Sequence, residues 1–221
     1  MQIAIDGPAG AGKSTISKFI AQEMGYLYID TGAMYRAIGY KALKENIDLD
    51  DNQKVDEMAK SSDIELKITD HGQSIFLDGA DVTSHIRTPE VSMAASKVSA
   101  IGGVRRTLVD LQRKIAGINN VIMDGRDIGT VVLPDAEIKI FLTASAEDRA
   151  MRRYLELKEK GMEVNYQAVL EDMETRDYND SHRAESPLKA ADDATVIDTS
   201  GQTLGESVQT IVEFIKSRVE A

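Results

Sequence analysis

Residues 7–14 read GPAGAGKS, and this short segment limits the possible folds of the chain more than any other feature. It fits the pattern G-x-x-x-x-G-K-[ST], which proteins place between a strand and a helix. An apolar run at residues 3–5 precedes it, and apolar residues recur at helical spacing over residues 16–24, with Gly25 as a stop. The segment therefore predicts an α/β fold whose first strand leads into a P-loop.

A P-loop wraps its backbone around a phosphate group, because its glycines allow close approach and its amides point inward at a helix N-terminus. Lys13 can reach the β and γ oxygens of a triphosphate, and the Ser14 hydroxyl can bind magnesium. The alternative is a glycine-rich turn that binds no ligand, but such a turn does not require Lys and Ser at the positions of Lys13 and Ser14. We therefore predict a nucleoside triphosphate site with Mg²⁺ as cofactor, formed by Gly7, Pro8, Ala9, Gly10, Ala11, Gly12, Lys13, Ser14 and Thr15.

Short β-branched runs alternate with helical segments along most of the chain. The predicted strands are residues 3–5, 26–29, 121–123, 138–142 and 195–197. This alternation is typical of a parallel sheet covered by helices on both faces, and it predicts the three-layer α/β/α fold of P-loop NTPases. Later helices carry start signals at Thr88, Ser145 and Thr203, and the last two precede an acidic residue at the spacing of a capping box.

One region departs from this alternation. Residues 64–69 and 74–77 alternate in polarity around a turn at 70–73, and a further short stretch ends at Val82. We predict a small antiparallel insert at residues 63–87 within a core of residues 1–62 and 88–221. Residues 154–168 are mostly polar, contain Gly161 and lie between two helices, which indicates a short helical lid or an ordinary connection between helices.

Composition excludes several classes of protein. The chain has 221 residues with 26 Lys and Arg against 37 Asp and Glu, a net charge of −11, which argues against nonspecific nucleic-acid binding. Cysteine is absent, so disulfides, thiolate catalysis and cysteine-ligated metals are excluded. We find neither an apolar run of about 18 residues nor a secretory signal pattern, and we expect a cytoplasmic protein that binds no membrane.

A P-loop alone does not distinguish a switch, a motor and a kinase, so a second anion site is informative. The segment at residues 30–36 (DTGAMYR) opens a helix after the second strand, and Arg36 is our candidate for binding phosphate there. The segment at 124–127 (DGRD) ends the third strand. Asp124 could hold magnesium or simply cap the next segment, and Arg126 could bind an acceptor phosphate.

Two later helices concentrate charge. One carries Arg149, Arg152 and Arg153, and the other carries Arg176, Asp177, Asp180 and Arg183. A solvated charged face is the ordinary explanation of such runs. Phosphate binding is the functional alternative, because a small-molecule kinase needs several cations near its two substrates.

Five motifs together resemble bacterial-type cytidylate kinase, a nucleoside monophosphate kinase family that phosphorylates CMP and dCMP from ATP. They are GPAGAGKST, DTGAMYR, IRTPEVSMAASKVSA, DGRDIGTVVLPDA and RDYNDSHR, and they occur in the family's order over nearly the whole chain. Only the P-loop is shared with unrelated NTPases.

The resemblance implies a set of site residues. The CMP-binding positions are Thr31, Tyr35, Arg36, Ser96, Arg105, Arg126, Asp127, Arg176, Asp180 and Arg183. Among them, Ser96, Arg105 and Asp127 match cytosine-contacting positions, and Arg176 and Asp180 match ribose-binding positions. The implied catalytic residues are Lys13, Arg126, Arg149, Arg153 and Arg183, and the implied metal ligands are Ser14 and Asp124.

We therefore expect a monomeric enzyme that converts ATP and CMP or dCMP to ADP and CDP or dCDP. Its partners would be small molecules, with no nucleic acid. A UMP/CMP-type or shikimate-type kinase would use the same P-loop and remains an alternative. A nonenzymatic ATP-dependent switch is a second alternative, although a switch needs no second phosphate pocket.

Overall fold

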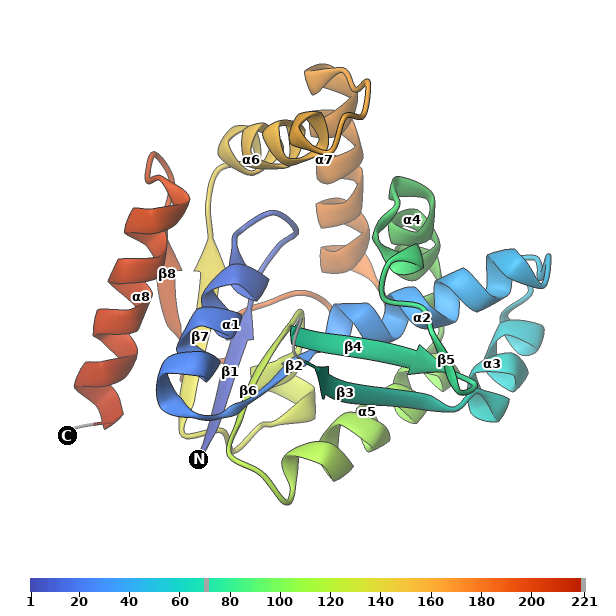
Figure 1. Cartoon of the computed structure of the whole chain (residues 1–221), viewed down its shortest axis with the longest axis horizontal. Coiled ribbons are helices and arrows are strands. Elements are labelled where there is room, and N and C mark those ends of the chain that lie inside the picture. The colour runs from blue at the N-terminus through green and yellow to red at the C-terminus, as the bar shows by residue number, and fades with distance from the viewer. Residues whose placement is uncertain (70–71, 220–221) are drawn as a thin grey trace. The chain divides into compact units, whose positions relative to one another are not determined.

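The computed structural model describes residues 1–69 and 72–219, and its chain divides into two compact units. The first unit comprises Met1–Tyr28 and Asn119–Ala221, and the second comprises Ile29–Ile118. Figure 1 labels the helices and strands of both units.

A five-stranded sheet in the order β2-β6-β1-β7-β8 organises the first unit. The strands are β1 Gln2–Asp6, β2 Leu27–Asp30, β6 Val121–Gly125, β7 Ile138–Thr143 and β8 Thr195–Asp198. Each lies where the sequence predicts it, and β1 runs parallel to both β6 and β7. The predicted α/β class and parallel sheet are therefore confirmed, with the P-loop leaving the carboxyl end of the central strand.

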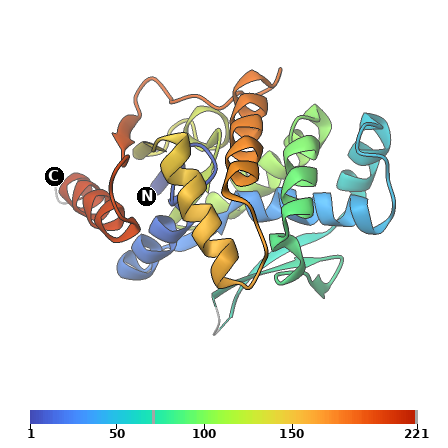
Figure 2. The same ribbon diagram turned by 90° about the horizontal axis from the view of Figure 1, so that it is seen from above.

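Four helices accompany this sheet: α1 Lys13–Met24, α6 Ala146–Glu159, α7 Tyr166–His182 and α8 Leu204–Val219. Apolar side chains of α1 and α8 share one core with β1 and β7, and the two helices lie side by side (Figure 1). Helices α6 and α7 also lie side by side (Figure 2) and are joined by residues 160–165, within the predicted lid. None of the helices in the described ranges is both long and apolar enough to cross a membrane.

The second unit contains a three-stranded antiparallel sheet, β3 Ile64–Thr69, β4 Gly72–Leu77 and β5 Ala80–Asp81. The predicted antiparallel strands are thus confirmed, although residues 70 and 71 of the predicted turn lie outside the described residues. The remaining elements are α2 Thr31–Lys44, α3 Asn52–Ser61, a 3₁₀ turn His85–Arg87, α4 Pro89–Val98 and α5 Gly102–Ala116. Sheet and helices share one core, and the boundaries of the insert at 63 and 87 stay a prediction.

The predicted helix starts follow from local hydrogen bonds. The Thr88 hydroxyl accepts a backbone N–H in the first turn of α4, and Thr203 and Glu206 form a reciprocal capping box before α8. The box predicted at Ser145 is only half formed. The Ser145 hydroxyl accepts the Asp148 N–H, but the Ser145 N–H donates to the Ser200 hydroxyl instead of to the Asp148 carboxylate. Each such cap contributes about 1 kcal/mol.

Helices α2 and α4 approach so closely that one position between them requires glycine. A Cβ atom on Gly39 would lie 2.9 Å from the Ala95 nitrogen and 3.1 Å from the Ala94 carbonyl carbon. We predict that Gly39→Ala lowers the free energy of unfolding by about 1–3 kcal/mol, because backbone atoms cannot move aside. Gly205→Ala in α8 is the control, since nothing lies within 4 Å of its Cβ, and it should be neutral or gain up to about 1 kcal/mol. Urea unfolding of both variants measures the difference, and equal stabilities would contradict the close approach.

Candidate active site

The P-loop adopts a tightly curled backbone that only glycine tolerates at its key positions. Gly10 and Gly12 have φ values of 74° and 91°, in the left-handed region. A Cβ on Gly7 would lie 1.9 Å from the Leu142 carbonyl oxygen on β7. The loop is therefore held against the sheet and ends directly in the N-terminus of α1, where a phosphate is favoured.

Lys13 is buried at the start of α1, and its ammonium donates to the Pro8 carbonyl oxygen at 2.7 Å, across its own loop. Burial, and then the nearby Arg126 guanidinium, lower the pKa of Lys13 below its usual value. The carboxylates of Asp124 and Asp6 oppose this shift. A bound triphosphate would add negative charge beside the amine and would favour its protonated form.

Ser14 and Asp124 meet as the sequence predicts. The Ser14 hydroxyl donates to Asp124 Oδ2 at 2.8 Å, and the Tyr28 hydroxyl donates to Oδ1 at 2.8 Å. Within the described ranges, no three His, Cys, Asp or Glu side chains cluster into a protein-only metal cage. One hydroxyl and one carboxylate nevertheless fit Mg²⁺, which keeps several waters and takes its other ligands from phosphates. Sequence analysis missed Tyr28, which the sheet brings to this edge from β2.

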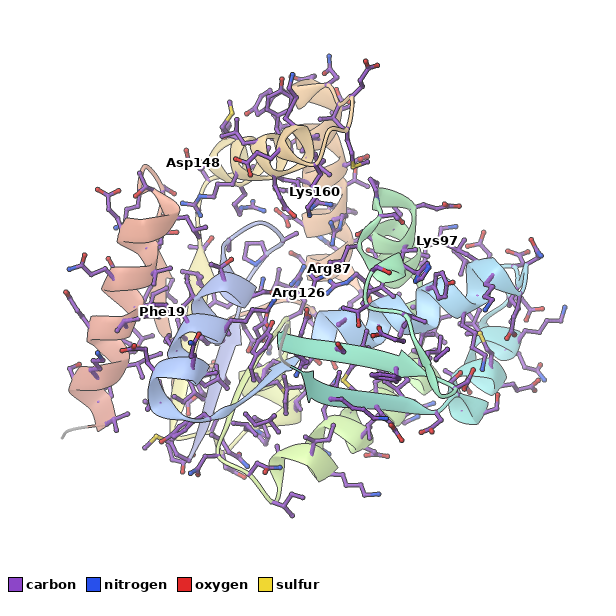
Figure 3. All side chains as sticks on the ribbon, in the orientation of Figure 1. Phe19, Arg87, Lys97, Arg126, Asp148 and Lys160 are labelled. Atoms are coloured by element: carbon purple, nitrogen blue, oxygen red, sulfur yellow. The ribbon has the colours of Figure 1, made fainter. Side chains whose placement is uncertain are left out.

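Arg126 directly follows β6 and forms an ion pair with a carboxylate on α7. Its Nε donates to Asp180 Oδ2 at 2.8 Å, and the exposed fraction is 22% for the Arg126 side chain, which Figure 3 labels, and 9% for that of Asp180. Burial raises the pKa of Asp180, but the guanidinium groups of Arg126, Arg183 and Arg176 together outweigh it and hold that pKa below its usual range. Arg183 Nη2 lies 3.7 Å from Asp127 Oδ1. Arg183 stands one residue after α7 rather than inside it, because the chain becomes extended there.

Arg149 connects three segments of the first unit. Its Nε donates to the Ala144 carbonyl at 2.9 Å, Nη1 donates to the Ala9 carbonyl of the P-loop at 3.0 Å, and Nη2 lies 2.7 Å from Asp177 Oδ2 on α7. Helix α7 also packs on the loop, since a Cβ on Gly10 would lie 3.0 Å from Met173 Cε. Asp177 is therefore part of the site's framework, which the charge run alone did not indicate.

Arg153 and Arg176 are placed differently. Arg153 forms an ion pair with Glu156, three residues further along α6, at 2.8 Å. Arg176 lies on α7, where it contributes to lowering the pKa of Asp180. The structure thus brings Arg149 to the P-loop, whereas the contact shown for Arg153 stays within its own helix.

In the second unit, Asp30 organises the start of α2. Its Oδ1 accepts the Ala33 N–H at 2.8 Å, as an N-cap, and its Oδ2 lies 3.0 Å from Arg36 Nη2. Asp30 Oδ2 also lies 3.6 Å from Arg87. Thr31, the first residue of the helix, is buried. The predicted phosphate-binding arginine is therefore held on a carboxylate.

Tyr35, Arg105 and the end of α4 come together in the second unit. The Arg105 guanidinium carbon lies 5.6 Å from the centre of the Tyr35 ring, and Arg105 Nη1 donates to the Ser99 carbonyl at 3.1 Å. Ser96 lies one turn earlier, and its carbonyl accepts from the Ser99 hydroxyl at 2.8 Å. Arg105 is almost fully buried, so its fork is fixed in orientation by packing and hydrogen bonds.

Asp6 is a buried acid that sequence analysis passed over. It ends β1 directly before the P-loop, and its carboxylate accepts the Ile128 and Gly129 N–H groups, both at 2.7 Å. Burial raises its pKa to about 6. An acid that ends an apolar strand at the carboxyl edge of a parallel sheet was the available signal.

Comparisons with known proteins agree with this geometry. The sequence profile of a family described as cytidylate kinase matches residues 3–217. A protein named cytidylate kinase from Caldicellulosiruptor bescii is 56% identical over 214 residues, which cover 97% of this chain and 95% of that protein. One of the same name from Bacillus subtilis is 50% identical over 218 residues, 99% of this chain and 97% of that protein. A crystal structure of an uncharacterized protein from Eubacterium ventriosum shares the fold, with a TM-score of 0.52, 15% identity and coverage of 98% and 99%.

The buried pair of Asp180 and Arg126 yields a prediction. Asp180→Ala should lower the free energy of unfolding by about 3 kcal/mol at neutral pH, because it leaves a buried guanidinium without its carboxylate. Since the pKa of Asp180 is lowered, the pair stabilises the fold above the ordinary carboxyl pKa and loses this effect as pH falls through the lower folded value. The stability difference from the wild type should therefore shrink below about pH 4. Lys97→Ala, which breaks the exposed pair with Asp50, should cost below about 1 kcal/mol, and a similar loss in both variants would contradict the assignment.

Proposed function

The chain belongs to the cytidylate kinase family, and from this premise we propose that it transfers the γ-phosphoryl group of ATP to CMP or dCMP. The products would be ADP and CDP or dCDP. The observation that carries the proposal is the family match over residues 3–217, because that range contains the P-loop and also the acceptor-side motifs. We further propose a monomeric enzyme of the cytoplasm.

For the donor, we propose that residues 7–15 surround the phosphates of ATP. The Lys13 ammonium would give up its hydrogen bond to the Pro8 carbonyl and donate to the β and γ phosphate oxygens instead. A hydrogen bond to a charged oxygen is about twice as strong as one to a neutral carbonyl. Ser14 and Asp124 would hold Mg²⁺, whose charge neutralises the β and γ phosphates when it is bound. The Tyr28 hydroxyl supports this role because it orients Asp124.

For the acceptor base, we propose Ser96, Arg105 and Asp127. Cytosine presents O2 and N3 as acceptors and its exocyclic amine as a donor. A guanidinium fork suits the first two, and a carboxylate or hydroxyl suits the amine. The fixed orientation of Arg105 supports this assignment, because a rigid fork loses little entropy on binding.

For the acceptor phosphate we propose Arg36, Arg126 and Arg183, and also the Thr31 hydroxyl and Tyr35. We propose Arg176 and Asp180 for the ribose. Arg36 forms an ion pair with Asp30 through Nη2, and Arg126 forms one with Asp180 through Nε. In each case only part of the guanidinium makes this contact. A guanidinium has five N–H donors, so a phosphate can share it with the carboxylate or replace the carboxylate.

The proposed chemistry depends on position and charge rather than on a base. An acceptor phosphate oxygen is already ionised near neutral pH, and phosphoryl transfer requires mainly alignment and neutralisation of the transferring group. Lys13 and Arg126, with Arg149, Arg153 and Arg183, would supply that positive charge. Closure of the lid at residues 154–168 would exclude water and so limit ATP hydrolysis.

A panel of acceptors tests the function. ADP release should depend on CMP or dCMP, with much slower turnover on UMP and none on shikimate. Lys13→Ala should lose turnover with its thermal unfolding temperature nearly unchanged, because the side chain acts on the phosphates rather than on the core. UMP or shikimate as the best acceptor would support another kinase, and tight ATP binding without acceptor-dependent turnover would support a switch.

Asp127→Asn tests how the base is recognised. An amide can donate to uracil O4, which a carboxylate repels, so the variant should narrow the ratio of kcat/KM for CMP to that for UMP. We expect kcat/KM for CMP to fall roughly a hundredfold, as for loss of a charged hydrogen bond, while KM for ATP barely changes. Steady-state kinetics with each acceptor decides this, and an unchanged ratio would remove Asp127 from the base site.

A further inference from the structure

Asp6 contacts the end of β6 through its backbone and the following turn through its side chain. In the sheet it pairs with Gly125, the last residue of β6. Its carboxylate, only 4% exposed, then accepts the Ile128 N–H through Oδ1 and the Gly129 N–H through Oδ2, both at 2.7 Å. Only Arg126 and Asp127 lie between these attachments. One residue of β1 therefore fixes the backbone on both sides of this dipeptide.

The turn from Ile128 to Val132 is a single π-helical turn, and its first amides need acceptors. Asp127 stands at the N-cap position but does not cap the turn with its side chain. Asp6 supplies the cap from another strand. The fit is close, since a Cβ on Gly129 would lie 3.4 Å from Asp6 Oδ2 and 3.2 Å from Lys139 Cδ.

Burying a charged carboxylate costs free energy, so a purely structural cap at this depth would not need one. Burial raises the pKa of Asp6, the nearby Asp127 charge raises it further, and the two amides and Lys13 lower it. A neutral asparagine would avoid the cost of burying charge, but in the same orientation it would present its oxygen to one of these N–H groups and an NH2 donor to the other. The two short bonds account for the acid, because each carboxylate oxygen holds one amide.

We propose that Asp6 is a positioning residue that holds Arg126 and Asp127 in the conformation that binds the acceptor nucleotide. The inference rests on the proposed function, in which Arg126 meets the acceptor phosphate and Asp127 meets the base. Asp6 itself touches neither substrate in this account. Because Asp6 directly precedes Gly7, one residue also connects the donor loop with the acceptor turn.

Asp6→Asn is the diagnostic variant, because it keeps the shape and removes one acceptor. KM for CMP should rise roughly tenfold, as expected for loss of one charged hydrogen bond, while KM for ATP should change less than about twofold. Hydrogen exchange measured by mass spectrometry should be faster over residues 126–133, because one amide loses its acceptor. A role in general stability alone would not separate the two KM values.

Glu137→Gln is the matched control. Glu137 Oε2 accepts the Gln2 N–H at 2.6 Å, so this variant also alters a carboxylate bonded to the backbone of β1, at the opposite end of the strand. It should leave both KM values unchanged. If Asp6→Asn fails to fold, Asp6→Glu keeps the charge but moves the carboxylate away from its position against the two amides, and it should give the same separation of KM values.

The outcomes separate the inference from the function on which it rests. Faster exchange with an unchanged KM for CMP overturns the positioning role, and so does an equal rise of both KM values. In either case the wild type still phosphorylates CMP, and the proposed function stands. A wild type that does not use CMP overturns the function instead.

Discussion

Arginines held below the surface of a protein must be neutralised inside it, and the arrangement of the candidate site depends on this constraint. The structure shows this in three ion pairs, which join Arg126 to Asp180, Arg149 to Asp177 and Arg36 to Asp30. An unpaired guanidinium at such a depth would lower the stability of the fold, so each partner carboxylate stabilises the ligand-free protein. The net charge of −11 is compatible with this site, because the compensation is local.

The parallel sheet determines which of these groups meet in the first unit. Asp6, Gly125 and Phe141 stand in register on adjacent strands, so the loops after β1, β6 and β7 leave from one edge. The P-loop follows β1, the Arg126–Asp127 dipeptide follows β6, and residues 144–145 lead from β7 into α6. The positions of the candidate site residues in the first unit thus follow from strand order.

Local signals explain what the sequence predicted well. The P-loop, the five strands and the start of α4 depend on residues a few positions apart, and each lies where it was predicted. Tertiary contacts explain what it missed. Tyr28 and Asp6 reach their partners across the sheet, over separations of 96 and 122 residues, and no local pattern records such contacts. Arg149 and Arg153 lie four residues apart on one helix, yet only the structure shows that Arg149 reaches the P-loop.

The paired arginines also bear on how long a nucleotide stays bound. In the proposed mechanism, a phosphate takes over donors from a carboxylate that already satisfies part of the guanidinium. The affinity gained is then the difference between two similar interactions rather than the full strength of one. In that mechanism such an exchange would favour short residence times, and the carboxylates that stabilise the ligand-free protein would also promote the release of product.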